Sequence, residues 1–323
     1  MSVLIQTQNL VKRYGNLWAV NDVSMTIQSG TIVGLVGRNG AGKTTLIRLL
    51  TGLAKPTSGT FQIMPEEGRL DTSVAAIVER PSVYLNMSGL DNLKAQSHLL
   101  GLPIDEEYLK STLQLVRLDP TSKKKVNDYS LGMRQRLAIA MTLVGKPKLL
   151  ILDEPTNGLD PQGIHDMREI FVNLNQKFGV TLLVSSHILT ELGKFATEFY
   201  FMERGRIIKH ATAEEIAQNS QKRLRITVDN TPKAIEVVRG MCAPQVDSTT
   251  EEATTDASLE PQPVEIKVQA VAVDTIEIVG EIPTTQILLA LAQNGITATN
   301  VVTLGDDLES YYISLLNGGA NHA

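Results

Sequence analysis

The chain is poor in cysteine, with a single one, Cys242, in 323 residues. One cysteine excludes an internal disulfide, which is typical of proteins in a reducing compartment. Long apolar runs are also missing, because no segment approaches the roughly 18 residues that a membrane-spanning helix needs. The N-terminal stretch MSVLIQTQNLVKRYG is too short and too polar for a secretory signal, and we expect none. Any role at a membrane is therefore expected to depend on a separate partner.

An excess of positive charge is the third absence. The formal net charge is −5, whereas proteins that bind nucleic acid depend on basic clusters. The only strong basic cluster, Lys123–Lys125, is more typical of a solvated loop. The composition therefore favours partners other than nucleic acid.

Residues 1–220 alternate strands and helices and are predicted to form one α/β domain. VLIQTQ and VSMTIQ have the alternating pattern of a half-exposed antiparallel sheet. TIVGLV, KLLILD and VTLLVSS are short continuous apolar runs, as expected for strands that are covered on both faces. Residues from about 85 to 145 have helical spacing, which predicts a helical subdomain inserted into the α/β core.

Residues 221–323 differ from the first part in composition and in the pattern of strands and helices, and they are predicted to form a small accessory domain. Strand and helix patterns follow in the order β-α-β-β-α-β, which is that of a ferredoxin-like α+β fold, and a last helix follows over DLESYYISLLNG. Residues 243–263 are rich in Thr, Ala and Pro, with several acids and no Lys or Arg. Such a composition buries little apolar surface and predicts a flexible acidic loop.

A phosphate-binding loop follows the first continuous apolar run directly. Its sequence, GRNGAGKTT, has the spacing Gly-x-x-x-x-Gly-Lys-Thr between a buried strand and a helix. Backbone N–H groups of such a loop and the N-terminus of the following helix bind phosphate oxygens. Lys43 is expected to reach the β and γ phosphates, and the Thr44 hydroxyl to hold Mg²⁺. The predicted nucleotide-binding residues here are Gly37, Arg38, Asn39, Gly40, Ala41, Gly42, Lys43, Thr44 and Thr45.

Two adjacent carboxylates end the apolar run KLLILDEP. Neighbouring side chains on a strand point to opposite faces, so the two can have separate tasks. Asp153 is predicted to hold Mg²⁺ opposite Thr44, and Glu154 to act as the general base that polarises the attacking water. The sequence thus predicts hydrolysis of a nucleoside triphosphate.

A second anion-binding helix start is predicted in YSLGMRQR, with Ser130 as its N-cap and Gly132 leaving the backbone accessible. Because the loop before Lys43 already provides a phosphate site for one nucleotide, this second helix start is suited to the γ-phosphate of a nucleotide bound by another subunit. The order of these motifs resembles the ATP-binding subunits of ABC transporters, whose signature is Leu-Ser-Gly-Gly-Gln. Ser130 and Gly132 match it, while Leu131 and Met133 replace the first glycine and the glutamine.

The resemblance implies the fold and several further roles. It implies a P-loop NTPase ABC cassette, with a mixed sheet and a helical subdomain, that binds ATP and Mg²⁺ and forms a head-to-tail dimer. Tyr14 matches the aromatic that stacks on adenine, and Asp160 in NGLD matches the aspartate of the loop that crosses between subunits. His187 matches the histidine that senses the γ-phosphate and holds Glu154 and the water. Ser130, Gly132 and Met133 would contact the partner's nucleotide.

Glu79 stands where the family normally has glutamine, at the junction with the helical subdomain. The resemblance places this residue near the nucleotide and the metal; the alternative is a residue that caps a turn beside Arg80. Glu79 and the YSLGMRQRL form of the signature resemble the bacitracin and lantibiotic resistance branch of exporters. This implies an ATPase at the cytoplasmic face of the membrane that drives a separate polytopic permease, which exports an amphipathic peptide antibiotic or a lipid-like compound. Val83, Tyr84 and Leu85 are candidate docking residues for the permease; the alternative is that they belong to the local core.

Three alternatives remain at this point. A chromosome-maintenance ATPase would carry a long coiled coil between Lys43 and Ser130, where no sustained heptads occur. A soluble regulatory or translation factor usually joins two cassettes, whereas this sequence has one phosphate loop. An importer cassette is the nearest alternative, and Glu79 and Met133 argue against it.

Overall fold

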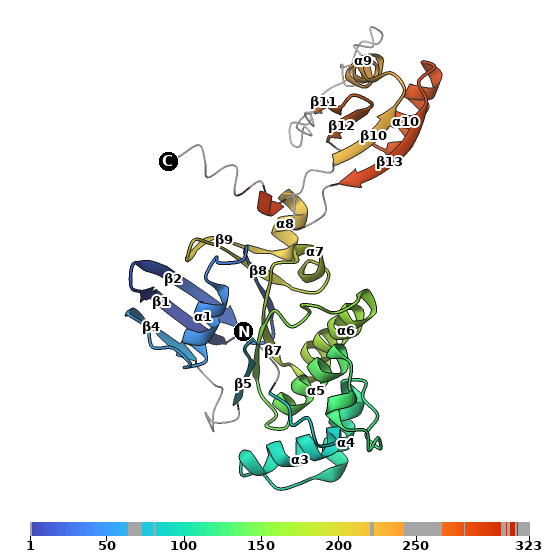
Figure 1. The fold of residues 1–323 in the computed structure, drawn as a ribbon. Helices are drawn as coiled ribbons and strands as arrows, with labels where there is room; N and C mark the ends of the chain where they lie inside the picture. The colour runs from blue at the N-terminus through green and yellow to red at the C-terminus, as the bar shows by residue number, and fades with distance from the viewer. Residues whose placement is uncertain are drawn as a thin grey trace, which may run out of the picture. The chain divides into compact units, whose positions relative to one another are not determined.

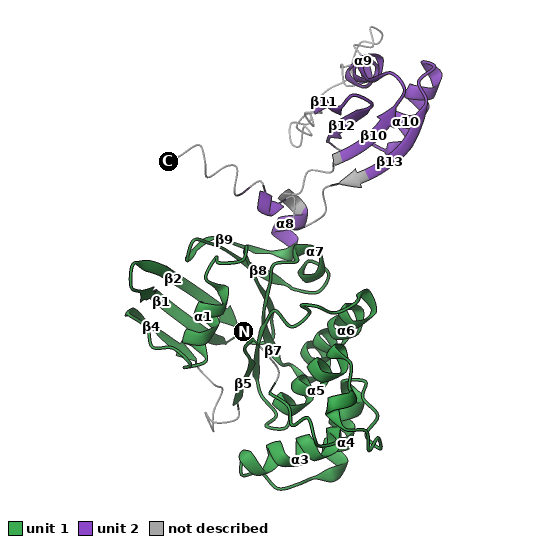
Figure 2. Cartoon of the chain, in the orientation of Figure 1, with its two compact units in different colours: residues 1–213 green, residues 214–323 purple. Residues whose placement is uncertain are grey.

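The computed structural model describes residues 2–63, 73–79, 82–219, 223–241, 267–280, 282–304, 308, 311–313 and 315. The chain divides into two compact units, Met1–Ala213 and Glu214–Ala323 (Figure 2). The sequence prediction sets the domain boundary at residues 220–221. The predicted acidic loop and most of the predicted last helix lie outside the described residues.

A six-stranded sheet forms the centre of the first unit. Its strand order is β5-β6-β7-β3-β8-β9, parallel except for the last pair. The strands are β5 (Val74–Ile77), β6 (Leu149–Asp153), β7 (Thr181–Ser186), β3 (Ile32–Val36), β8 (Glu198–Glu203) and β9 (Arg206–Thr212). Every residue of β3, β6 and β7 is buried, which confirms the prediction from the three continuous apolar runs.

An antiparallel sheet in the order β2-β1-β4 lies beside the same core. It consists of β1 (Val3–Tyr14), β2 (Leu17–Gln28) and β4 (Ser58–Ile63). The hairpin is longer than the two predicted strands because pairing continues through several register shifts to its turn. Helix α1 (Lys43–Leu50) packs with both sheets, and its buried residues Leu46, Ile47, Leu49 and Leu50 share one apolar cluster with Ile5, Val20, Leu35 and Leu149.

The predicted helical subdomain is present and consists of α3 (Gly89–Leu99), α4 (Glu106–Leu115), the 3₁₀ turn η1 (Val126–Asp128) and α5 (Leu131–Leu143) (Figure 1). Side chains cap these helices as their sequences favour: Ser88 accepts a hydrogen bond from the Asp91 N–H, and Asp105 accepts one from the Tyr108 N–H. The other helices before residue 220 are α6 (Pro161–Phe178), α7 (Leu189–Leu192) and α8 (Ala213–Asn219), and all of α8 except Ala213 belongs to the second unit.

The second unit follows the predicted element order. After α8 come β10 (Arg223–Val228), α9 (Thr231–Met241), β11 (Lys267–Ala272), β12 (Thr275–Val279), α10 (Thr284–Gln293) and β13 (Ala298–Leu304). The antiparallel sheet has the order β11-β12-β10-β13. One face of it packs on α9 and α10 through an apolar cluster of its own. Within the residues that the structure describes, no helix of either unit has the length and apolarity to cross a membrane.

Candidate functional site

The loop between β3 and α1 is tightly folded. The side chain of Lys43 folds back over this loop, and its Nζ donates a hydrogen bond to the Gly37 carbonyl at 2.6 Å. A Cβ at Gly37 would lie 2.4 Å from the Met202 carbonyl oxygen, and one at Gly42 would lie 2.2 Å from that of Ala19. Gly42 also has φ +108°, which L side chains rarely adopt. Glycine is therefore required at both positions for the loop to pack.

This loop lines a cavity of about 640 Å³, which falls in the size range of small-molecule sites. Eight of the nine predicted residues of the phosphate loop, all except Gly37, line it, together with the predicted base and histidine. The lining residues are Leu17, Trp18, Ala19, Arg38, Asn39, Gly40, Ala41, Gly42, Lys43, Thr44, Thr45, Glu154, Asn157, His187 and Arg204. Positive Lys43 and Arg38, successive backbone N–H groups and the start of α1 suit a polyphosphate.

The aromatic side chain at this cavity is Trp18. It pairs with Arg13 across the β1–β2 hairpin, and the Arg13 guanidinium lies 5.3 Å from the centre of its ring. Tyr14, the predicted adenine partner, is 45% exposed, has Lys12 over its ring and does not line the cavity. Sequence reasoning missed Trp18. The sequence did offer a clue, because Trp18 is the only tryptophan of the chain and follows Tyr14 closely, across the turn of the hairpin.

Asp153 and Glu154 come at the end of β6 and have different surroundings. Asp153 is 5% exposed and accepts a 2.6 Å hydrogen bond from the Ser185 hydroxyl. Ser185 in turn accepts a hydrogen bond from the Glu154 N–H at 2.9 Å. Glu154 has φ +49°, a conformation that costs free energy in a residue with a Cβ and often occurs at functional sites. Ser185 was not predicted, although it lies in the buried run VTLLVSS.

Glu154 lies between a cation and an imidazole. Its Oε1 lies 3.2 Å from Lys43 Nζ, and its Oε2 lies 2.7 Å from His187 Nδ1. The His187 N–H also donates to Oε2 at 3.4 Å. This arrangement holds a carboxylate beside the phosphate loop in a fixed orientation, as a general base requires.

The donor set fits ATP with Mg²⁺. Thr44 lines the cavity, and Asp153 ends the strand that brings Glu154 into it. Among the described residues, no three His, Cys, Asp or Glu side chains gather as a metal-binding cluster. Mg²⁺ commonly takes one or two protein ligands and completes its shell with phosphate oxygens and water. Two protein ligands, the number predicted here with Thr44 and Asp153, are compatible with that coordination.

Ser130, Gly132, Met133 and Asp160 do not line this cavity. Ser130 caps α5 by accepting a hydrogen bond from the Met133 N–H at 3.3 Å, and Asp160 caps α6 by accepting one from the Gly163 N–H at 2.9 Å. Both helix starts are thus capped by their own side chains, and both lie outside the lining of the cavity at the Lys43 loop.

Glu79 also lies outside the lining of the cavity. Its carboxylate is 56% exposed and forms an ion pair with Arg48 in the last turn of α1. Its φ is +65°. In this structure the carboxylate thus has a charge partner that the sequence did not reveal.

Comparison with known proteins points to one family. Residues 20–157 match the family described as ABC transporter. The bacitracin transport ATP-binding protein BcrA of Enterococcus faecalis is 32% identical over 324 residues, covering 99% of this chain and 98% of that protein. The lantibiotic transport ATP-binding protein SrtF of Streptococcus pyogenes is 43% identical over 64% of this chain and 89% of that protein.

Solved structures agree in fold. The structure of cbiO1 from Clostridium perfringens, described as part of the ABC transporter complex cbiONQ, has a TM-score of 0.60 at 24% identity, over 68% of this chain and 92% of that one. The ADP conformation of MJ1267, an ATP-binding cassette of an ABC transporter, has a TM-score of 0.59 at 25% identity, over 67% of this chain and 93% of that one.

Proposed function

The chain belongs to the ABC transporter family, and we propose that it powers the export of a bacitracin-like or lantibiotic-like peptide antibiotic through a separate permease. It is an ATP-hydrolysing subunit that uses ATP and Mg²⁺, and it works with membrane subunits at the cytoplasmic face. The importer alternative is disfavoured, because the similar proteins BcrA and SrtF are named for bacitracin and lantibiotic transport.

The observation that carries the ATPase mechanism is the position of Glu154 between Lys43 and His187. When bound, ATP supplies the phosphoryl bond that is broken and Mg²⁺ neutralises its oxygens. Lys43 and the loop N–H groups would bind the phosphates. A Glu154 oxygen would accept the proton of the attacking water. His187, 2.7 Å from that carboxylate, would hold the carboxylate in the orientation that accepts this proton.

The cassette pairs with a second copy in our proposal. Ser130, Gly132 and Met133 at the start of α5 and Asp160 at the start of α6 would contact the nucleotide held by the partner's Lys43 loop. Support comes from their separation from the chain's own cavity and from the capped helix starts described above. ATP binding would close the dimer, and hydrolysis would let it open.

Antibiotic resistance in cells tests the transported class. The chain is expressed with its permease in a susceptible host, and the inhibitory concentrations of bacitracin and of a lantibiotic are measured. We expect both subunits together to raise at least one of them, and Lys43→Ala in the cassette to abolish the effect. Unchanged inhibitory concentrations for both compounds, with both subunits present in the membrane, would exclude this substrate class.

A further inference from the structure

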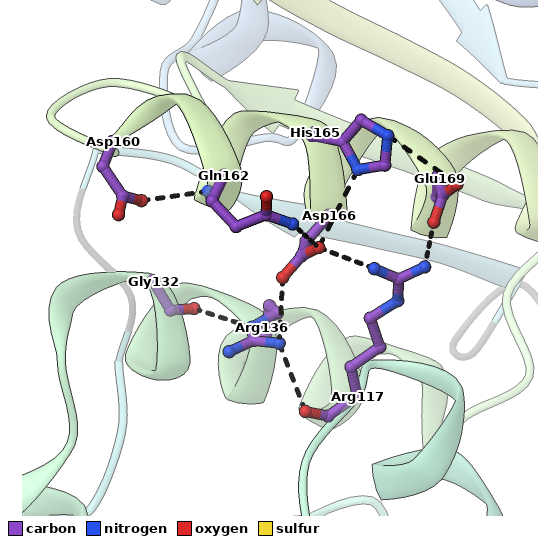
Figure 3. A network of polar contacts seen from close by, with 9 residues as sticks. Arg117, Gly132, Arg136, Asp160, Gln162, His165, Asp166 and Glu169 are labelled. Carbon is purple, nitrogen blue, oxygen red and sulfur yellow. Dashed lines mark hydrogen bonds and ion pairs between the residues drawn. The ribbon is translucent and has the colours of Figure 1, made fainter.

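A network of charged side chains joins the helical subdomain to α6 (Figure 3). Arg117, just after α4, donates to Asp166 Oδ1 at 2.6 Å and also pairs with Glu169. Arg136 on α5 lies 3.6 Å from the other oxygen of Asp166. Gln162 donates to Asp166 Oδ1 at 3.0 Å. Asp166 is therefore the residue that the two arginines share.

The centre of this network is largely shielded from water. The side chains of Asp166 and Arg136 are 16% and 17% exposed, against 43% for Arg117. Exposed single ion pairs contribute little to stability, whereas networks with a shielded carboxylate are stronger and hold a more defined geometry. Arg136 is further held by the Gly132 and Arg117 carbonyls, to which it donates at 3.4 and 3.2 Å. Removing the charge of Asp166 would leave two guanidinium groups without their common partner.

A second contact joins the same two parts near their N-terminal ends. A Cβ at Gly158 would lie 3.2 Å from Leu131, and one at Gly132 would lie 3.4 Å from Leu159. Hence the first turn of α5 packs against the loop that leads into α6. Gln135 adds a weak hydrogen bond to the Asn157 carbonyl at 3.4 Å.

These two contacts have a geometric consequence. Two helices that touch at one point can pivot, but a second contact one or two turns along removes that freedom. The loop contact lies beside Ser130 and Asp160, and the Asp166 network lies farther along both helices (Figure 3). The relative position of the two helix starts thus depends on both contacts, and Asp166 contributes to it although it lies at neither start.

We propose that Asp166 is a positioning residue that keeps Ser130 and Asp160 in one rigid unit, so that a subunit presents both to its partner's nucleotide together. This inference rests on the head-to-tail dimer proposed above. Asp166 touches no nucleotide itself. Its role is to tie α5 to α6 while the dimer closes.

The test uses the full-length chain with Asp166→Asn, a substitution of nearly equal size without the charge. ATP binding is titrated at low protein concentration, ATP-dependent dimerisation is measured in the Glu154→Gln background by light scattering, and turnover is measured in the parent background against protein concentration. We expect ATP affinity to change by less than about twofold, since Asp166 is outside the cavity. Dimerisation should weaken by about tenfold, and kcat at saturating ATP should fall while KM changes little.

Two further variants separate positioning from general destabilisation. Asp166→Glu keeps the charge and should restore a large part of dimerisation. Glu106→Gln removes a carboxylate that pairs with Lys94 and Lys110 at 2.8 Å each in the same subdomain, and it should dimerise like the parent. Arg136→Lys replaces Asp166→Asn if the latter does not fold, because lysine keeps the charge but cannot bridge Asp166 and the two carbonyls.

Parent-like dimerisation and kcat in Asp166→Asn, or in Arg136→Lys where it is the variant used, would overturn the proposal. An equal loss in Glu106→Gln would overturn it too, since the effect would then belong to the subdomain's stability. If Glu154→Gln alone binds ATP without dimerising, the proposed head-to-tail closure fails first, and this inference fails with it.

Discussion

Lys43 and Glu154 form an ion pair, with 3.2 Å between Nζ and Oε1. Lys43 is 5% exposed and Glu154 is 21% exposed, so the pair is shielded from water. A phosphate that enters the loop would compete with Glu154 for the same ammonium group. Nucleotide binding and release of the carboxylate toward water are therefore linked through one side chain.

Glu154→Gln removes the proposed base without changing its size. We expect hydrolysis to fall by at least roughly 10²-fold, and ATP affinity to stay the same or increase, because Lys43 loses its competing anion. Turnover and equilibrium ATP binding are measured on the same preparation. Near-normal turnover would eliminate Glu154 as base, and Lys43→Ala is the matched control that should lose ATP binding itself.

His187→Ala tests whether orientation of the base matters. The imidazole lies 2.7 Å from the Glu154 carboxylate, and its loss leaves the carboxylate with Lys43 and the long backbone contact from residue 187. We expect kcat to fall by about 10-fold to 10²-fold with little change in ATP affinity. His187→Gln can still donate to the carboxylate and should recover part of the rate. Equal rates for the alanine, glutamine and parent proteins would contradict a positioning role.

Trp18 is the only tryptophan in the chain and lines the nucleotide cavity, so its fluorescence reports on binding there. We expect MgATP to change the emission, and Trp18→Ala to weaken ATP binding by about tenfold, in line with base–aromatic stacking of 1–3 kcal/mol. Tyr14→Ala is the comparison and should weaken ATP binding less than Trp18→Ala does. A larger loss for Tyr14→Ala would return the adenine contact to the tyrosine.

The parts of the fold that the sequence predicts are those dictated by local pattern. Continuous apolar runs predicted β3, β6 and β7, and Ser130 caps a helix start as expected. The chemistry predicted for Lys43 and Glu154 also follows from local spacing, because Lys43 ends the glycine-rich loop after β3 and Glu154 directly follows β6.

The parts that were missed depend on contacts between distant segments. The ion pair of Arg48 with Glu79 joins residues 31 positions apart, and that of Arg117 with Asp166 joins residues 49 apart. No periodicity marks either pair. Trp18 was missed for a related reason, since its place at the cavity follows from the register of the hairpin with Arg13.

A chain that ends at residue 219 tests the independence of the first unit. Its apolar clusters are separate from that of the second unit, and the nucleotide cavity is lined only by residues up to Arg204. We expect this shortened chain to unfold cooperatively and to bind ATP like the full-length protein. Loss of cooperative unfolding, followed by calorimetry, would show that residues 220–323 are needed for the core.

Glu79→Gln asks whether this carboxylate acts near the metal. In the described structure Glu79 pairs with Arg48 outside the cavity, so a metal-linked role requires this ion pair to break. The nearby Tyr84 and Leu85 are 44% and 43% exposed, as a docking surface for the permease would be. Docking there could release Glu79 from Arg48.

We therefore expect the Mg²⁺ dependence of ATP hydrolysis to be the same for parent and Glu79→Gln in the isolated cassette, and to differ once the permease is present. A carboxylate close to Mg²⁺ strengthens its binding, so the variant should need more Mg²⁺ in the assembled transporter. Arg48→Ala, which frees Glu79, should shift the curve of the isolated cassette in the opposite direction. If the parent and Glu79→Gln curves superimpose in both settings, Glu79 is a surface partner of Arg48 and has no link to the metal.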